Sequence, residues 1–266
     1  MSNYHIKHLE EYYQVYRKSV REPENFWEEI AEEHFMWQRK WDKVLSWDFS
    51  KPEVKWFEGA QLNITENCID RHLATRGEKT AILFEPNNPS EEAKHITYNQ
   101  LHARVNQFAN VLKEQGVNKG DRVCIYLPMI PELAISVLAC ARIGAIHSVV
   151  FAGFSATALS TRINDSDCKM VITSDGSYRG AKTIDLKGII DEALEDCKCV
   201  ETVLVAKRIY SDITMKSGRD KWLQALLDNA STECKAETMN SEDPLFILYT
   251  SGSTGLPKGM VHSTAG

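Results

Sequence analysis

The sequence predicts an α/β protein with a parallel β-sheet and helices on both faces, preceded by a tryptophan-rich helical extension. Two observations predict this class. From residue 79 onward, short apolar runs alternate with segments of helical periodicity, which is typical of a parallel sheet covered on both faces. The first sixty or so residues lack this alternation and are rich in aromatic and charged side chains. A chain of 266 residues is long enough to bury a sizeable core in one large domain or two.

Residues 1–65 are expected to form the extension. They contain five of the six tryptophans in the chain. Pro23 stands at the start of a predicted helix with acidic residues in its first turn, and Phe26, Ile30 and His34 follow at helical spacing. A stripe of tryptophans can bind a ligand, but packing against a core is the interpretation that ordinary burial tendencies favour.

Residues 66–266 are expected to form the α/β domain. Its regular part begins with two short strands, Lys79–Phe84 and His95–Tyr98, and a capping box, Thr97-x-x-Gln100, starts the next helix. Five apolar runs then predict the strands of the main sheet: Val123–Leu127, Ala145–Val150, Met170–Thr173, Val203–Val205 and Leu245–Tyr249. Helices are predicted at Pro131–Arg142, Ser155–Ile163, Asp185–Leu194 and Lys221–Leu227.

The last residues suggest that the chain continues. Ser263 and Thr264 are typical of the N-cap of a further helix. A domain that stops there would leave its sheet partly uncovered. We therefore expect the chain to be part of a longer protein.

Charge and apolar patterning exclude several classes. Lys and Arg total 31 against 37 Asp and Glu, a net charge of −6, which argues against binding nucleic acid through a broad basic face. The longest apolar stretch, Leu133 to Ile146, is too short to cross a bilayer, and residues 1–20 lack the apolar core of a signal peptide. The seven Cys and eight His lack the spacing of a metal site. We expect a cytoplasmic protein with reduced cysteines that binds neither nucleic acid nor membranes.

The strongest motif follows the last predicted strand and reads YTSGSTGLPKG over residues 249–259. Glycines let the backbone approach an anion closely, hydroxyl and amide groups donate to phosphate oxygens, and a lysine adds positive charge. A few such hydrogen bonds, on the order of 1.5–3 kcal/mol each, can hold a polyphosphate. The expected phosphate-binding residues are Thr250, Ser251, Gly252, Ser253, Thr254, Gly255 and Lys258. The motif is not a Walker A loop, because Gly259 follows the lysine where that loop has serine or threonine.

A second segment with anion-binding chemistry, SDGSYRGAK at residues 174–182, comes just after a predicted strand. Loops beyond the carboxyl ends of parallel strands are where open α/β sheets bind ligands. Arg179 and Lys182 supply cationic donors, and Gly180 allows a close approach. From the residues alone, two basic side chains in a loop are more often simply solvated. The acidic residues interpreted as solvated are Asp165, Asp167, Asp191 and Glu192.

The motif at 249–259 resembles the phosphate-binding signature of the adenylate-forming superfamily, which includes acyl-CoA synthetases, luciferases and adenylation domains of peptide synthetases. Further segments resemble AMP-forming acetyl-CoA synthetases: WFEGAQLN at 56–63, DRH at 70–72, GDRV at 120–123, LACARIGA at 138–145 and VVFAGFS at 149–155. The resemblance runs from about residue 4 to the last residue. It implies the N-terminal part of the adenylate-forming fold, with an acetyl-CoA synthetase-type extension over 1–65. Residues 66–266 are then the first part of the AMP-binding domain, cut just after the phosphate loop.

The resemblance implies a ligase that acts in two steps. A carboxylate, here acetate, attacks the α-phosphate of Mg-ATP to give acetyl-AMP and pyrophosphate, and the thiol of CoA then displaces AMP. In such enzymes the matching phosphate loop holds the β- and γ-phosphates by electrostatic stabilisation. One departure is Leu256, where many relatives have lysine, so this loop has one positive charge fewer.

Two further segments match the family's CoA site. The residues that match the segment contacting the phosphorylated nucleotide end of CoA are Arg179, Gly180, Ala181 and Lys182. Many relatives have a second glycine at Ala181. The Gly153-Phe154 turn matches residues that border the CoA channel, although from the sequence alone its main role is to lead into a helix capped by Ser155.

No catalytic or metal-binding residue is expected within 1–266, because the family's acyl pocket, adenine contacts and catalytic lysine come later in the chain. This chain alone is therefore expected to show no turnover, and its expected partner is the remainder of the same enzyme chain. One alternative is a propionyl-CoA or other short-chain acyl-CoA synthetase. Another is a module that binds CoA or phosphate without chemistry. A dinucleotide-dependent oxidoreductase is disfavoured, because no GxGxxG follows any predicted strand.

Overall fold

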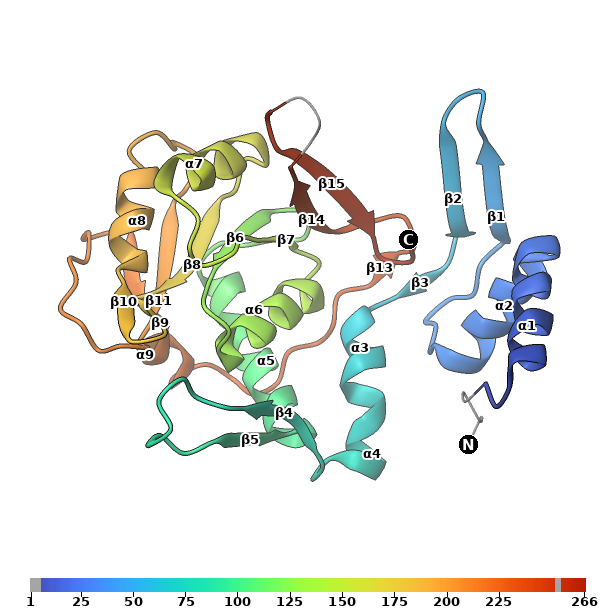
Figure 1. Cartoon of the computed structure of the whole chain (residues 1–266), viewed down its shortest axis with the longest axis horizontal. Coiled ribbons are helices and arrows are strands. Elements are labelled where there is room, and N and C mark those ends of the chain that lie inside the picture. The colour runs from blue at the N-terminus through green and yellow to red at the C-terminus, as the bar shows by residue number, and fades with distance from the viewer. Residues whose placement is uncertain (1–5, 252–254) are drawn as a thin grey trace. The chain divides into compact units, whose positions relative to one another are not determined.

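The computed structural model describes residues 6–251 and 255–266 (Figure 1). The chain forms two compact units. The first comprises the residues up to Leu62 together with Asn240–Glu242 and Ala265–Gly266, and the second comprises Asn63–Met239 and Asp243–Thr264. The main β-sheet lies entirely within the second unit.

The first unit is built from two helices and a β-hairpin. Its elements are α1 (Leu9–Arg21), α2 (Pro23–His34), β1 (Lys43–Asp48), β2 (Glu53–Glu58) and β3 (Gln61–Leu62). The predicted helix is confirmed, with Pro23 in the first turn of α2, where its missing N–H costs no hydrogen bond. The antiparallel hairpin of β1 and β2 was not predicted.

Three of the tryptophans form a core within this unit. Trp37 and Trp41 lie against Phe57 with ring centroids 5.3 and 5.0 Å apart, and Trp56 joins the same cluster. The indole N–H of Trp37 donates to a backbone carbonyl, so its polar edge is satisfied as well. The packing interpretation is confirmed for these three side chains, whereas the exposed tryptophans are Trp27 and Trp47.

The second unit is centred on a seven-stranded sheet with the order β12-β11-β8-β6-β7-β14-β15. Its strands are β6 (Arg122–Tyr126), β7 (Ile146–Val149), β8 (Met170–Ser174), β11 (Thr202–Ala206), β12 (Asp220–Trp222), β14 (Pro244–Thr250) and β15 (Lys258–Ser263). Neighbouring strands are parallel except for β14 and β15, which are antiparallel. The five predicted strands of the main sheet are confirmed.

Helices cover both faces of this sheet (Figure 1). The helices of the unit are α3 (Ile64–Cys68), α4 (Leu73–Arg76), α5 (Tyr98–Glu114), α6 (Pro131–Arg142), α7 (Ala156–Asp165), α8 (Leu186–Ala193) and α9 (Leu223–Leu227), with a 3-10 turn at Asp70–His72. In β6, Val123 and Ile125 pack with α5 and α6, whereas the alternating Cys124 and Tyr126 pack with α7 and α8. Because such strands are buried on both faces, they read as continuous apolar runs. The predicted fold class is confirmed.

Short strand pairs complete the unit. Their bounds are β4 (Thr80–Phe84), β5 (Lys94–Thr97), β9 (Ser177–Arg179) and β10 (Lys182–Ile184), with β13 (Met239–Asn240) near the boundary of the unit. β4 pairs with β5 and β9 with β10, both antiparallel. At the end of β5, Gln100 N donates to Thr97 Oγ1 and Thr97 N donates to Gln100 Oε1, so the predicted capping box is confirmed.

The helix predicted at Lys221–Leu227 was wrong in its first residues. Asp220–Trp222 form β12, an edge strand parallel to β11, and only Leu223–Leu227 are helical. The carboxylate of Asp220 is fully buried and pairs with the neighbouring Arg219 and with the distant Lys187 of α8, and the contact with Lys187 helps to hold this segment extended. Local helical spacing carries no information about such contacts.

The predicted helix N-cap is wrong for Ser263, whereas for Thr264 it stays a prediction, because a helix starting there would lie beyond residue 266. Ser263 is the last residue of β15, which pairs along β14. The Thr264 hydroxyl and backbone N–H both donate to the carbonyl of Asp243, each at 2.9 Å. The threonine therefore closes the open end of the β14–β15 hairpin by donating to a backbone carbonyl.

A buried ion network joins α8 to β12. Lys187 is 1% exposed, and its Nζ lies 2.6 Å from Asp191 and 2.8 Å from Asp220. The Arg219 guanidinium also contacts both carboxylates. Burial raises the pKa of Asp220, but hydrogen bonds from Arg219 and Lys187 outweigh it, and the pKa is lowered overall. The solvated interpretation of Asp191 was therefore wrong.

Two other acidic residues interpreted as solvated also have defined partners. Asp165 accepts a hydrogen bond from the Tyr249 hydroxyl at 2.6 Å. Asp167 pairs with Arg122 at 2.6 Å. Spacing along one helix or turn cannot reveal these partners, because they come from strands distant in the sequence.

His147 on β7 is a buried histidine in an aromatic stack. It is 7% exposed, and its ring lies 5.5 Å from that of Phe246, which stacks on His262 at 4.4 Å. Its Nδ1 has no hydrogen-bond partner among the residues that the structure describes. Burial lowers the pKa of His147 to about 4, so the ring is neutral at pH 7.

Neither a membrane span nor a metal cluster is found in the described part of the chain. Within residues 6–251 and 255–266, no helix has both the length and the apolar character to cross a bilayer. The same residues contain no group of three or more His, Cys, Asp or Glu side chains placed to hold a metal ion.

Candidate functional site

The carboxyl ends of the parallel strands share one edge of the main sheet. The segments that follow β6, β7, β8, β11 and β14 all emerge there, since these strands run in the same direction. Such an edge is the usual ligand site of an open α/β sheet. Both segments that the sequence predicts to bind anions, 174–182 and 249–259, follow strands of this set.

The segment after β8 is a β-hairpin. Arg179 of β9 and Lys182 of β10 are opposite each other in the register, and Gly180 adopts φ +60° at the turn between them. All three are exposed, as is Ala181. Neither cation has an ion-pair partner among the described residues, so both are available to a bound anion. The side-chain amide of Asn87 donates to the Gly180 carbonyl at 3.2 Å and fixes the turn from one side.

The buried carboxylate of Asp175 fixes the base of this hairpin. Asp175, directly after β8, is fully buried and accepts backbone N–H bonds from Arg208, Ile209 and Tyr210 at 2.7, 3.1 and 2.7 Å. Hydrogen bonds to an ionised group are roughly twice as strong as those between neutral groups. Asp175 therefore locks the segment after β11 against the base of the hairpin.

The side chain of Arg208, in the segment after β11, reaches to the β9–β10 hairpin. Its guanidinium lies 4.9 Å from the Tyr178 ring and 5.7 Å from the Phe84 ring, and it pairs with Glu91 at 3.1 Å. Sequence reasoning missed the roles of Asp175 and Arg208. The only signal was the position of Asp175 at the end of a buried strand, because the partners come from other loops.

A cavity of about 550 Å³ lies beside the hairpin at this edge. Arg179 and Tyr178 line it together with Phe151 and Arg208, and Leu248 of β14 contributes from the neighbouring strand. The cavity combines aromatic and apolar walls with two guanidinium groups. That lining suits a flat ring attached to phosphate groups.

The predicted phosphate-binding motif, residues 249–259 (hereafter the phosphate motif), lies in the β14–β15 hairpin. Thr250 ends β14 and lies opposite Lys258, the first residue of β15. Both are exposed, as is Ser251, and Gly255 adopts φ +87°, a left-handed conformation that favours glycine. Gly252, Ser253 and Thr254 lie outside the described residues.

The Gly153-Phe154 turn lies next to this hairpin. A cavity of about 510 Å³ is lined by Gly153, Phe154 and Arg162 on one side and by Leu256 and Pro257 of the phosphate motif on the other. The structure thus brings the turn together with the phosphate motif, whereas Arg179 lines the separate 550 Å³ cavity. Ser155 caps α7 by accepting the Ala158 N–H at 3.3 Å, as the sequence predicted.

Comparisons with known proteins identify the family of the chain. Residues 69–266 match the family model described as AMP-binding enzyme. The chain belongs to the AMP-binding enzyme family. Residues 12–68 match the model of the acetyl-coenzyme A synthetase N-terminus.

Relatives of this AMP-binding chain include acetyl-coenzyme A synthetases. It is 53% identical to acetyl-coenzyme A synthetase of Halorhodospira halophila over 258 residues, covering 97% of this chain and 40% of the relative. It is 55% identical to acetyl-coenzyme A synthetase 2 of Pseudomonas aeruginosa over 257 residues, again 97% and 40%. Acetoacetyl-CoA synthetase from Streptomyces lividans matches in structure with a TM-score of 0.85 and 30% identity, over 94% of this chain and 38% of that one. The chain thus spans about 40% of its relatives' length, and the resemblance to acetyl-CoA synthetases is confirmed.

The buried cysteines of this AMP-binding chain are poorly suited to nucleophilic chemistry. Burial raises the pKa of Cys140 and of Cys168 to about 12. Burial also raises the pKa of Cys124 well above its usual value. At neutral pH these thiols are protonated, and the thiolate is the reactive form. All seven cysteines are free.

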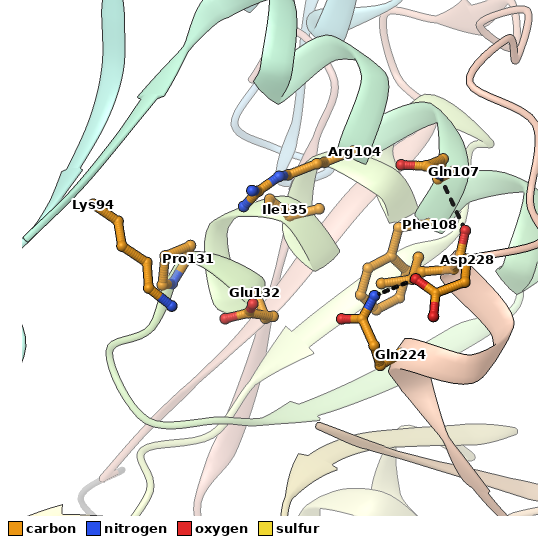
Figure 2. A pocket seen from close by; sticks show the side chains of 10 residues that line it. Lys94, Arg104, Gln107, Phe108, Pro131, Glu132, Ile135, Gln224 and Asp228 are labelled. Carbon is orange, nitrogen blue, oxygen red and sulfur yellow. Dashed lines mark hydrogen bonds between the residues drawn. The ribbon is translucent and has the colours of Figure 1, made fainter. Parts of the chain in front are cut away.

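A further cavity of about 360 Å³ is lined by residues of β5, α5, α6 and α9. Figure 2 shows the side chains that line it. Lys94, Arg104 and Glu132 lie around it, so its lining mixes charges of both signs. None of the predicted site residues lines it. We assign no ligand to this cavity.

Proposed function

We propose that the chain is the N-terminal part of an acid–thiol ligase that converts acetate, ATP and CoA into acetyl-CoA through acetyl-AMP. The pairing of an acetyl-coenzyme A synthetase-type extension with an AMP-binding segment supports this reaction class. Acetate is favoured as the acyl donor because the relatives that match over the whole chain are acetyl-CoA synthetases. Under this proposal residues 1–65 are the extension, 66–266 begin the AMP-binding domain, and the enzyme works in the cytoplasm on small molecules.

The observation that carries the proposal is the placement of two exposed cationic elements at one edge of the sheet. Arg179 and Lys182 on their hairpin would hold the phosphorylated nucleotide end of CoA, with the adenine in the cavity of about 550 Å³. Thr250, Ser251 and Lys258 on the β14–β15 hairpin would hold the β- and γ-phosphates of ATP. In the first step the donors on the β14–β15 hairpin would stabilise the negative charge that develops on the departing pyrophosphate.

The proposal assigns binding, and no bond-making step, to residues 1–266. The described residues contain no cluster of carboxylates or histidines that could hold the magnesium ion of Mg-ATP. Burial raises the pKa of Cys124, Cys140 and Cys168, so these thiols are poor candidates for a nucleophile. The proposal places magnesium binding and the chemical steps on the part of the enzyme outside residues 1–266, as the resemblance to acetyl-CoA synthetases implies.

The first prediction concerns CoA binding by the 266-residue chain. Calorimetric titration is expected to show that CoA binds about 10- to 100-fold more tightly than dephospho-CoA, because the 3′-phosphate loses its charged donors in the latter. Arg179→Ala is expected to weaken CoA binding by a similar factor and to leave dephospho-CoA nearly unaffected. Arg104→Ala, on α5 and beside the separate cavity in Figure 2, is the matched control and should change neither. Equal affinity for the two ligands, or equal losses in both variants, would contradict the assignment.

A further inference from the structure

The two segments that flank the β14–β15 hairpin in the sequence fold with the first unit. Asn240–Glu242 lead into β14 and Ala265–Gly266 follow β15, and both belong to the compact unit built from the residues up to Leu62. The hairpin, which contains the phosphate motif, belongs to the second unit. At each of its ends the hairpin is therefore continued, through the chain, by a segment that folds with the extension.

A series of backbone hydrogen bonds joins these two segments to the extension. The Ala265 N–H donates to the carbonyl of Ser241, and the Ser241 N–H donates to the carbonyl of Ala60, each at 3.0 Å. Ser241 is 1% exposed and Ala60 is fully buried. Hydrogen bonds in such surroundings are electrostatically stronger than in water. The three residues thus connect three distant parts of the sequence within the first unit.

Further contacts strengthen this junction. The Trp56 N–H donates to Glu242 Oε1 at 3.0 Å, and hydrogen bonds to a charged group are roughly twice as strong as those between neutral groups. Ala265 packs against the buried cluster of the first unit that includes Phe57 and Ala60. The segment before β14 and the segment after β15 are therefore fixed to the same small core.

Strand pairing by itself specifies the position of β15 weakly. β15 is the last strand in the order of the sheet, with β14 as its neighbour. Met260 and Val261 are adjacent and so lie on opposite faces of the strand, yet they are 52% and 60% exposed, so burial within the described part of the chain selects neither face. The register also shifts between Pro244 and Phe246, so the ladder accommodates an extra residue at this end.

We propose that the extension is a positioning element for phosphate binding, because it holds both ends of the β14–β15 hairpin and so keeps Lys258 opposite Thr250. A slip of one residue would turn the Lys258 side chain to the other face of the sheet. A hairpin with released ends would spend part of its time in such arrangements, and its apparent affinity for a phosphate ligand falls with the competent fraction. The inference rests on the proposed function, because it requires a phosphate site on this hairpin.

The main test is Ala265→Pro, which removes the N–H that donates to Ser241. In calorimetric titrations of the 266-residue chain with inorganic pyrophosphate, this variant is expected to bind about 3- to 10-fold more weakly, as a competent fraction of roughly 10–30% requires. Ala265→Ser keeps the N–H and should bind normally. Gly266→Pro is the matched control, because it places the same ring at the next residue, where the described residues show no backbone hydrogen bond to lose.

Hydrogen exchange locates the effect within the chain. The backbone amides of β15 are expected to exchange about 10-fold faster in Ala265→Pro than in the unsubstituted chain, whereas the amides of β6 and β8 should exchange at unchanged rates. A general loss of stability would accelerate all three strands together. This readout does not depend on any ligand, so it tests the positioning of the hairpin separately from phosphate binding.

Glu242→Ala tests the second contact without altering the backbone. Glu242 is exposed, so its replacement carries little risk to folding. The variant loses the acceptor of the Trp56 N–H and is expected to bind pyrophosphate about 2- to 5-fold more weakly than its control. That control is Glu233→Ala, which removes the same charge from an exposed position in the second unit.

The outcomes separate this inference from the proposed function. If the folded, unsubstituted chain does not bind pyrophosphate, the phosphate site is overturned, and the role of the extension with it. If the chain binds pyrophosphate and both test variants bind it as tightly as their controls, only the role of the extension is overturned. Equal acceleration of exchange in β15, β6 and β8 would also overturn that role. If Ala265→Pro does not fold, Glu242→Ala decides by the same criteria.

Discussion

Replacing Lys187 with methionine is expected to lower the free energy of unfolding by about 3–5 kcal/mol. The ammonium group of Lys187 is buried to 1% exposure between Asp191 and the fully buried Asp220. Removing it leaves Asp220 with Arg219 as its remaining cationic side-chain partner, in surroundings that solvate an anion poorly. The loss is to be measured by urea unfolding of the 266-residue chain at pH 7, with the midpoint and slope compared between the two proteins.

A double-mutant cycle distinguishes the ion pair from packing. Lys187→Met combined with Asp220→Leu removes both buried charges, and replacing a whole buried pair by apolar residues costs far less than breaking it. The double variant should therefore be more stable than the sum of the two single losses implies. Lys221→Met, next to Asp220 but not paired with it, serves as the control. Additive losses in the cycle would show that the charges do not interact as the geometry indicates.

Lowering the pH from 7.5 to 5 is expected to destabilise the second unit by about 2 kcal/mol through His147 alone. An unfolded histidine titrates near pH 6.5, whereas burial holds the pKa of His147 at about 4 in the folded chain. Between these values the unfolded chain binds the extra proton, so this stability is fully present above about pH 6.5 and is lost as the pH falls toward 4. The full difference corresponds to about 3 kcal/mol.

The His147→Phe variant keeps a ring against Phe246 but cannot be protonated. Urea unfolding at pH 7.5 and at pH 5.0 should show a smaller pH dependence in this variant than in the unsubstituted chain, by about 2 kcal/mol. His147→Gln provides a second non-titrating side chain if phenylalanine is too large for the site. His262→Gln is the control at the outer side of the same stack. Identical pH slopes in all of these proteins would contradict the assignment.

The sheet could be predicted from the sequence because its strands are buried on both faces. Runs such as Val123–Leu127 and Val203–Val205 are apolar on both faces, so they differ clearly from the amphipathic helices between them. The capping box at Thr97 was equally readable, because all of its atoms lie within four residues. The helix over residues 23–34 was readable in the same way, from proline and acids at its start.

The parts that sequence reasoning missed depend on contacts between distant residues. Asp175 and Arg208 support the β9–β10 hairpin from two different loops, and Arg162 contacts rings from two other segments. A charged residue on a helix is interpreted as solvated when its ion-pair partners lie in another part of the sequence. Asp191, which pairs with Lys187 and Arg219, is an example. Strand β12 was missed for the same reason.

The sequence therefore predicted which segments form the candidate site, but it did not predict which of their side chains lie close together. Residue types and glycine spacing indicated which loops carry anion-binding chemistry, and the parallel order of strands indicated that they share an edge. Nothing in the sequence showed that the Gly153-Phe154 turn shares a cavity with Leu256 and Pro257, while Arg179 lines another. The binding roles of these residues stay predictions until the titrations are made.

The pairing of β14 with β15 also affects how freely the sequence of the segment between them can change. Thr250 and Lys258 lie opposite each other, so the sheet holds both ends of the segment between them. Closing a loop whose ends are already fixed costs little chain entropy, and even doubling its length adds only about 0.6 kcal/mol. Substitutions or insertions in that segment can therefore accumulate without endangering the fold. A library of variants in that segment can be screened for altered ligand binding while the residues of the sheet are left unchanged.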